Sequence, residues 1–246
     1  MKLLDTFAGI GGFSYAAEKL VGGFETTQFI EINPYCQKVL NKHWSHVPIH
    51  DDITTFTAKP GEFDIITGGF PCQDISVAGL QKGITKETRS GLFYELIRVI
   101  RMVRPKYVVL ENVAAILNRG LDIVLRELSE AGYDAEWAVI SASSLGACHR
   151  RSRWWLVAYP NSKRLQGLRG EYELQESCKE RTFTWRNSGI TLNPNWKGYK
   201  SKPTLCRGDD GLSNRVDRLK ALGNSIVPAV AAIPLQRVKD LYATAS

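Results

Sequence analysis

The alternation of short apolar runs with amphipathic runs along residues 1–132 constrains the fold more than any other feature. Strand-like runs lie at 2–7, 26–32, 47–53, 63–70 and 106–113, and helix-like runs at 13–21, 33–44, 90–105 and 120–132. In the helix-like run at 90–105, Phe93, Ile97 and Ile100 share one helical face. Repeated strand–helix units predict an α/β fold, with a mostly parallel sheet covered by helices on both faces.

Two further strand-like runs, 136–144 and 153–159, have little between them, which predicts an antiparallel pair. The alternation stops near Pro160, and a polar stretch without a clear period follows. Helical spacing returns in residues 216–243, with Pro228 near the start of a helix. Asn33 and Pro34 fit an N-cap and a first helical residue.

The composition narrows the class of protein. Of the 246 residues, 43% are hydrophobic, which is enough for a sizeable core. No apolar run is long enough to cross a bilayer, and the N-terminal stretch is a poor signal peptide, so we expect a cytoplasmic protein. The five cysteines form no CxxC pair, which disfavours a disulfide framework or a zinc site and favours a reducing compartment.

Nearly all of the excess positive charge lies in one segment. Residues 161–208 contain ten Lys or Arg and four Asp or Glu, a net +6 of the chain's +7. Trp185, Trp196 and Tyr199 punctuate the same stretch. A basic segment beside a balanced domain predicts a polyanionic partner.

Chemically reactive residues gather at the predicted carboxyl ends of the strands, where open α/β sheets bind their ligands. The glycine turn in DTFAGIGGFS follows the first strand, and Glu31 and Asp52 end the second and third. Ser14 stands where a dinucleotide fingerprint would have its third glycine, which weakens an NAD interpretation. Either the turn and its acids bind a nucleoside cofactor, or the turn is an ordinary one with a solvated acid.

A second group of candidates follows the fourth and fifth strands. In TGGFPCQDIS, Cys72 sits on a loop stiffened by Pro71; alone it would be a buried thiol, whereas a catalytic thiol requires a lowered pKa. Glu111 in LENV ends an apolar strand, as a catalytic acid or as a structural ion pair. Arg151 and Arg153 in HRRSR are two apart, so both side chains should point to one face of the strand, unless they mark only a solvated strand end.

Taken together, DTFAGIGGFS, IEINP, DDI, GGFPCQDIS, ENV, HRRSR and LGNSIVP resemble, in order, the motifs of the DNA (cytosine-5) methyltransferases. The resemblance implies a Rossmann-like S-adenosylmethionine-dependent methyltransferase sheet with a small irregular target recognition region. It implies that the Cys72 thiolate adds to carbon 6 of a flipped-out cytosine in duplex DNA. Glu111 would protonate ring nitrogen 3, so that carbon 5 accepts a methyl group from S-adenosylmethionine without a metal.

The resemblance also assigns the other site residues. Arg151 and Arg153 would orient the base or stabilise developing charge. The substrate would contact Pro71, Gln73 and Ser76. Cofactor-binding residues would be Phe7, Gly9, Ile10, Gly11, Glu31, Ile32, Asp52, Ile53, Asn224 and Ser225, with Glu31 on the ribose, Asp52 on the adenine amine and Asn224 with Ser225 at the methionine end.

The implied organisation is a catalytic and cofactor-binding domain at 1–159, a short basic recognition region at 160–210 and a returning segment at 211–246. His149 stands where the family usually has glutamine, and the recognition region is short. We expect a monomer that acts on double-stranded DNA, either alone or paired with a restriction endonuclease.

Three alternatives remain at this stage. A related enzyme could methylate transfer RNA, although the basic segment favours DNA. A decayed scaffold could bind DNA without catalysis, although Cys72, Glu111 and Arg151 are all present. An NAD-dependent oxidoreductase is disfavoured by Ser14 and by the basic segment.

Overall fold

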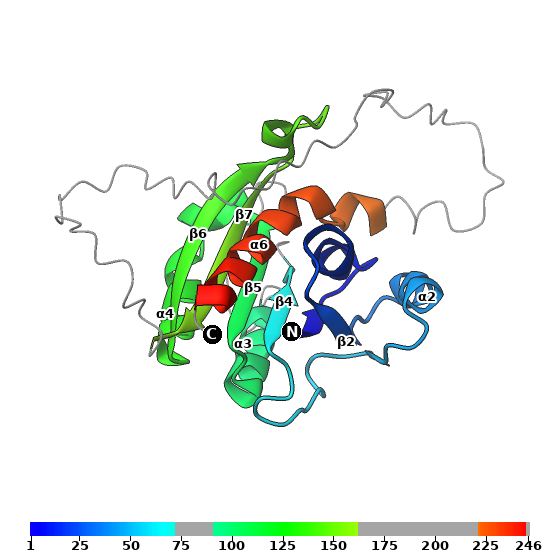
Figure 1. The fold of residues 1–246 in the computed structure, drawn as a ribbon. Helices are drawn as coiled ribbons and strands as arrows, with labels where there is room; N and C mark the ends of the chain where they lie inside the picture. The colour runs from blue at the N-terminus through cyan, green and yellow to red at the C-terminus, as the bar shows by residue number, and fades with distance from the viewer. Residues whose placement is uncertain (72–90, 162–220, 245–246) are drawn as a thin grey trace.

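Seven strands form one sheet within residues 1–71, 91–161 and 221–244, the ranges that this computed structural model describes (Figure 1). Their order is β3-β2-β1-β4-β5-β7-β6. The strands are β1 Lys2–Thr6, β2 Glu25–Ile30, β3 Ile49–His50, β4 Ile65–Gly68, β5 Tyr107–Val113, β6 Tyr133–Ser141 and β7 Ser152–Pro160. Strands β1 to β5 pair in parallel, whereas β7 is antiparallel to both β5 and β6. The predicted parallel sheet and the predicted antiparallel pair are both confirmed.

The helices divide between the two faces of the sheet. They are α1 Gly12–Tyr15, the π-helix η1 Ala16–Val21, α2 Pro34–His43, α3 Leu92–Val103, α4 Leu121–Glu130 and α6 Pro228–Thr244, with 3-10 helices η3 Ala114–Asn118 and η4 Ala142–Leu145. Helices α1, η1 and α6 pack on one face, and α3 and α4 pack on the other (Figure 1). The last helix therefore returns to the N-terminal part of the chain.

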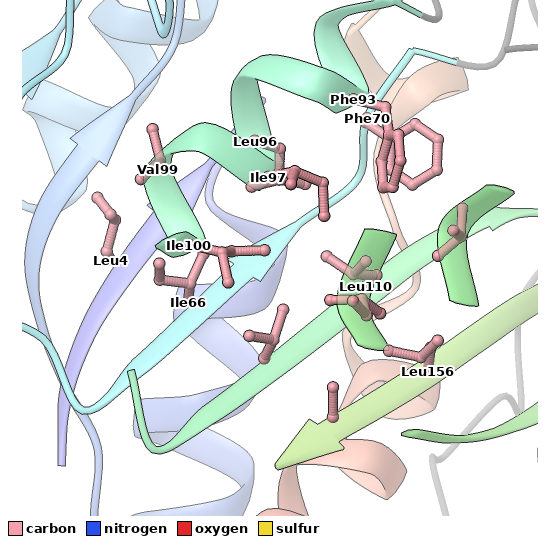
Figure 2. Close-up of a cluster of buried hydrophobic side chains, with 14 of the residues drawn as sticks. Leu4, Ile66, Phe70, Phe93, Leu96, Ile97, Val99, Ile100, Leu110 and Leu156 are labelled. Carbon is pink, nitrogen blue, oxygen red and sulfur yellow. The ribbon is translucent and has the colours of Figure 1, made fainter. Parts of the chain in front are cut away.

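Side-chain alternation along the strands supplies both cores. In β1, Leu4 joins the cluster under α3 and α4 (Figure 2), while Leu3 joins the cluster under α6. The neighbouring Trp154 and Trp155 of β7 divide in the same way, and both are almost fully buried. Burial on both faces explains why these strands read as continuous apolar runs.

Helix α2 packs against β2, with Leu40 in contact with the cluster around Phe29, and begins as its sequence predicts. The Asn33 side chain accepts hydrogen bonds from the backbone N–H groups of Tyr35 and Cys36, and Pro34 occupies the first turn. Because proline has no N–H to satisfy there, the pair is well suited to a helix start. Among the described residues, no helix combines the length and apolar character needed to span a membrane.

The third strand is shorter than the predicted run at 47–53. Strand β3 contains Ile49 and His50 alone, and pairs only with β2. It ends where the Asp52 side chain accepts a hydrogen bond from the backbone N–H of Thr54 at 2.9 Å. Such a side-chain turn competes with strand pairing, so the chain leaves the sheet at this point.

Candidate active site

A cavity of about 230 Å³ opens beyond the carboxyl ends of the parallel strands. Its wall includes Phe7, Gly9 and Ile10 of the glycine turn, Glu31, Gly69, Glu111 and, from the C-terminal part of the chain, Asn224, Ser225 and Ile226. Five segments distant in sequence therefore meet at one place, as expected for an open parallel sheet.

The glycine turn is held against Glu31. Gly9 has φ +55° and its backbone N–H donates to Glu31 Oε2 at 2.7 Å, while Asn33 N–H donates to Oε1 at 2.8 Å. Burial raises the pKa of Glu31, and these two amide bonds oppose the rise. Each carboxylate oxygen keeps a further lone pair, so Glu31 can still accept a hydroxyl donor from the cavity.

Gly11 serves packing instead of lining the cavity. It has φ +82° at the start of α1, and a Cβ at this position would lie 2.6 Å from Trp44 Cζ3. Only glycine fits both the left-handed backbone and this close approach. Gly11 was predicted to contact the cofactor, but in the structure it fixes the shape of the turn and lies outside the cavity wall.

Beneath the turn, the buried carboxylate of Asp5 joins two segments. Its Oδ2 accepts hydrogen bonds from the Ser14 hydroxyl at 2.7 Å and the Ser14 N–H at 3.3 Å, and its Oδ1 accepts from the Thr67 hydroxyl at 2.8 Å. Burial raises the pKa of Asp5 to about 7, against these hydrogen bonds. Ser14, which stands where a third glycine would be, thus has a structural role that sequence reasoning missed.

Glu111 is the acid best placed for chemistry in the cavity. It is only 9% exposed, and its Oε1 lies 3.0 Å from Arg153 Nε. Burial raises its pKa to about 7, although Arg153 and then Arg151 lower it. A Cβ on Gly69 would lie 3.2 Å from Glu111 Oε2, so the glycine admits this carboxyl. A carboxyl that titrates near neutral pH can donate a proton as well as accept one.

The next residue, Asn112, fixes the backbone that leads to Cys72. Its Nδ2 donates to the Phe70 carbonyl at 3.2 Å, and its Oδ1 accepts from the N–H of Val113 at 2.8 Å. Asn112 is 2% exposed, and a buried side-chain amide needs hydrogen-bond partners. The sequence signal that could have found it is an amide directly after Glu111 in a strand whose other residues are apolar or aromatic. Cys72 itself lies outside the described residues, as do Gln73 and Ser76.

The two arginines of the HRRSR motif contact different groups. Arg153 lies within β7 and pairs with Glu111. Arg151 precedes the strand with φ +33° and donates hydrogen bonds to the carbonyls of Gly223, at 3.0 Å, and Ser225. Strand alternation, on which the prediction of a shared face rested, does not extend to Arg151.

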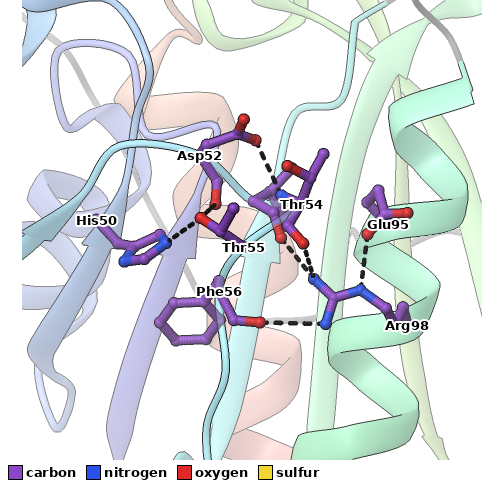
Figure 3. Close-up of polar contacts among 8 residues, drawn as sticks. His50, Asp52, Thr54, Thr55, Phe56, Glu95 and Arg98 are labelled. Atoms are coloured by element: carbon purple, nitrogen blue, oxygen red, sulfur yellow. Dashed lines mark hydrogen bonds and ion pairs between the residues drawn. The ribbon is translucent and has the colours of Figure 1, made fainter.

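A third arginine holds the loop that follows β3 (Figure 3). Arg98 of α3 donates to the carbonyls of Ile53 at 2.6 Å, Thr54 at 3.3 Å and Phe56 at 3.1 Å, and its Nε pairs with Glu95 at 2.6 Å. Arg98 thus holds the backbone directly after Asp52, whose side chain accepts from the Thr54 N–H. Nothing in the sequence pattern marked Arg98, because it sits on a helix face that reads as solvated.

Of the fourteen predicted site residues that the structure describes, seven line the cavity and seven lie outside its wall. Those lining the cavity are Phe7, Gly9, Ile10, Glu31, Glu111, Asn224 and Ser225. Those outside its wall are Gly11, Ile32, Asp52, Ile53, Pro71, Arg151 and Arg153. The Ile32 side chain is 71% exposed, whereas Ile53 is buried in the core. Across the described ranges, no group of three or more His, Cys, Asp or Glu could hold a metal ion.

Comparison with known proteins agrees with this geometry. The family described as C-5 cytosine-specific DNA methylase matches residues 1–204. The type II methyltransferase M.CviJI of Paramecium bursaria Chlorella virus IL3A is 34% identical over 212 residues, which are 84% of this chain and 54% of the relative. M.MspI of Moraxella sp is 27% identical over 226 residues, covering 88% and 51%. The chain thus spans about half the length of these curated relatives.

The fold is also that of a solved methyltransferase. The structure of Entamoeba histolytica methyltransferase EhMeth superposes with a TM-score of 0.64 at 14% identity, covering 100% of this chain and 99% of the other. At this identity the likeness concerns the fold alone. Because the family match covers most of the chain and the cavity holds its glutamate and glycine-turn motifs, this chain belongs to the C-5 cytosine-specific DNA methylase family.

Proposed function

We propose that this chain transfers a methyl group from S-adenosylmethionine to carbon 5 of cytosine in double-stranded DNA. The observation that carries the proposal is Glu111: a buried carboxyl, paired with Arg153, in the wall of a cavity that the glycine turn also lines. It titrates near neutral pH, as a group that protonates a pyrimidine ring should. Family membership supports the same chemistry.

The cavity fits S-adenosylmethionine by the chemistry of its donor set. Glu31 offers carboxylate lone pairs to ribose hydroxyls, Phe7 offers a flat apolar ring, and residues 224–225 add polar groups to the cavity wall. When bound, the cofactor supplies an electrophilic methyl group. Asp52 and Ile32 would complete the adenine end, although neither lines the cavity.

The protein's own residues activate the base. The Cys72 thiolate adds to carbon 6 of cytosine and Glu111 protonates nitrogen 3, so electron density moves to carbon 5, which takes the methyl group. A base then removes the proton from carbon 5, the carbon–sulfur bond breaks to release the thiolate, and nitrogen 3 returns its proton to the Glu111 carboxylate. Arg153 keeps Glu111 oriented, and Gln73 and Ser76 contact the extruded nucleotide.

Carbon 6 is shielded within a duplex, so the cytosine must leave the base stack. Extruding a base costs roughly a few kcal/mol in enzymes that flip bases. The basic segment at 160–210 supplies phosphate contacts for this step, and the enzyme acts as a monomer, alone or beside a restriction endonuclease. Charge supports this assignment, since residues 161–208 carry most of the chain's net positive charge.

The test is methyl incorporation from labelled S-adenosylmethionine into unmethylated duplex DNA and into transfer RNA, with Cys72→Ala as the control. We expect label in DNA, at cytosine carbon 5 by bisulfite sequencing, and none with the variant. DNA containing 5-fluorocytosine should trap a covalent adduct. Incorporation into transfer RNA alone would show that the substrate is transfer RNA and not DNA. DNA binding without incorporation or adduct would indicate a catalytically decayed enzyme.

A further inference from the structure

The HRRSR motif places Arg151 just before β7 in a backbone conformation that non-glycine residues seldom adopt. Its φ of +33° falls in the left-handed region, which costs an ordinary side chain conformational energy. Such strain persists only where the surroundings hold the residue in place. The surroundings here are the carbonyls of Gly223 and Ser225, both of which accept from the Arg151 guanidinium.

These carbonyls belong to a short segment that closes the cavity. Asn224, Ser225 and Ile226 line its wall, and Ile226 packs directly on the glycine turn at Gly12. Within the segment, the Ser225 N–H donates to the Ala221 carbonyl at 2.9 Å, and its hydroxyl donates to the Leu222 carbonyl at 3.0 Å. The segment therefore has a local shape, and Arg151 links that shape to the β6–β7 side of the sheet.

Resting on the proposed function, we propose that Arg151 is a positioning residue for the cofactor: it holds residues 223–226 against the glycine turn. Arg153 keeps the task of orienting Glu111. The two arginines of the motif then have different roles: Arg153 orients the acid that activates the base, and Arg151 holds the segment that encloses the methyl donor. This differs from the expectation that both arginines orient the base or stabilise the thiolate and the developing charge.

The experiment measures cofactor affinity without DNA, so that effects on the base do not enter. We would titrate S-adenosylhomocysteine into wild type, Arg151→Ala, Arg151→Lys and Arg153→Ala by calorimetry. Loss of two hydrogen bonds from a charged donor should weaken binding by about 10- to 100-fold in Arg151→Ala. Arg151→Lys keeps the positive charge but not the planar guanidinium that donates two hydrogen bonds at once, so its affinity should lie between those of Arg151→Ala and wild type. The affinity of Arg153→Ala should stay within about threefold of wild type, while this variant loses adduct formation.

Arg126→Ala is the matched control, because Arg126 is exposed on α4 away from the cavity, and it should match wild type. Hydrogen–deuterium exchange of residues 221–227 gives a second readout: faster exchange in Arg151→Lys supports the proposal even if Arg151→Ala does not fold. Unchanged affinity and unchanged exchange would overturn it. Failure of wild type to bind S-adenosylhomocysteine would instead overturn the proposed function.

Discussion

Replacing Gly12 by alanine tests how closely the C-terminal segment is packed on the glycine turn. A Cβ at Gly12 would lie 2.6 Å from Ile226 Cγ1 and 3.3 Å from its Cδ1, while the nearest backbone atom, the Ile226 carbonyl, is 3.6 Å away. Carbon atoms prefer about 3.5–4.0 Å, so the conflict is with the side chain alone. Gly12 begins α1 with no left-handed φ, so alanine suits its backbone.

The two contributions have opposite signs. Overpacking costs about 1–3 kcal/mol, whereas alanine in place of glycine in a helix gains about 0.5–1 kcal/mol. Gly12→Ala should therefore lower the free energy of unfolding by up to about 2.5 kcal/mol. With Ile226→Ala, both conflicting carbons are gone, and the same change should become neutral or stabilising by up to about 1 kcal/mol.

Urea denaturation of wild type, both single variants and the double variant measures the four free energies of unfolding. The expected sign reversal gives a coupling energy of roughly 1–3 kcal/mol between the two positions. If Gly12→Ala cost the same in both backgrounds, to within about 0.5 kcal/mol, the segment would not pack on the turn as described. Gly23→Ala serves as a control for glycine replacement outside this contact, at a residue whose φ of +87° predicts a loss that Ile226→Ala leaves unchanged.

Other perturbations test the site more briefly. Because folding raises the pKa of Asp5 from 3.8 to about 7, the native state binds an extra proton over that interval, so stability should fall as the pH rises from about 4 to 7, by at most about 1.4 kcal/mol per pH unit. Asp5→Asn should remove this share of the slope, which pH-dependent urea midpoints would show. Glu111→Gln should reduce turnover by about 100-fold or more with cofactor affinity nearly unchanged, and the wild-type rate of adduct formation should decline above pH 7, as the acid loses its proton. Glu31→Ala should weaken cofactor binding more than DNA binding in parallel titrations. Deleting residues 161–208 should flatten the salt dependence of DNA affinity, and an unchanged slope would move the phosphate contacts elsewhere.

Elements whose signal is local were predictable from the sequence. The start of α2 depends on Asn33 and Pro34, which are adjacent, and the apolar face of α3 depends on a spacing internal to one helix. The parallel pairing of β1 to β5 was predictable from the repeated strand–helix units. Glu31 and Glu111 could be placed at one rim because the carboxyl ends of parallel strands meet at the same edge.

Residues that act across the fold were not predictable in the same way. Arg98 holds a loop more than 40 positions away, and Arg151 reaches carbonyls more than 70 positions away. Backbone carbonyls carry no sequence signature, so an arginine that binds them reads as a solvated charge. Asp52 was expected to end the third strand, whereas β3 ends at His50 and Asp52 lies in the side-chain turn that follows, outside the cavity wall.

Three buried polar residues, Asp5, Thr6 and Asn112, have a consequence for Cys72, the nucleophile in the proposed function. Asp5 on β1 binds the Thr67 hydroxyl, the Thr6 hydroxyl donates to the Thr67 carbonyl at 2.7 Å, and Asn112 on β5 binds the Phe70 carbonyl. Strand β4 lies between β1 and β5, and buried polar groups of both neighbours hold the backbone at its end, at Thr67 and at Phe70. The described chain before Cys72 is therefore held from both sides, and Gly69 lies beside the carboxyl of Glu111. Loosening either grip should lower adduct formation without removing any group that touches the base, since a thiol displaced by about 1 Å can lose on the order of 100-fold in rate.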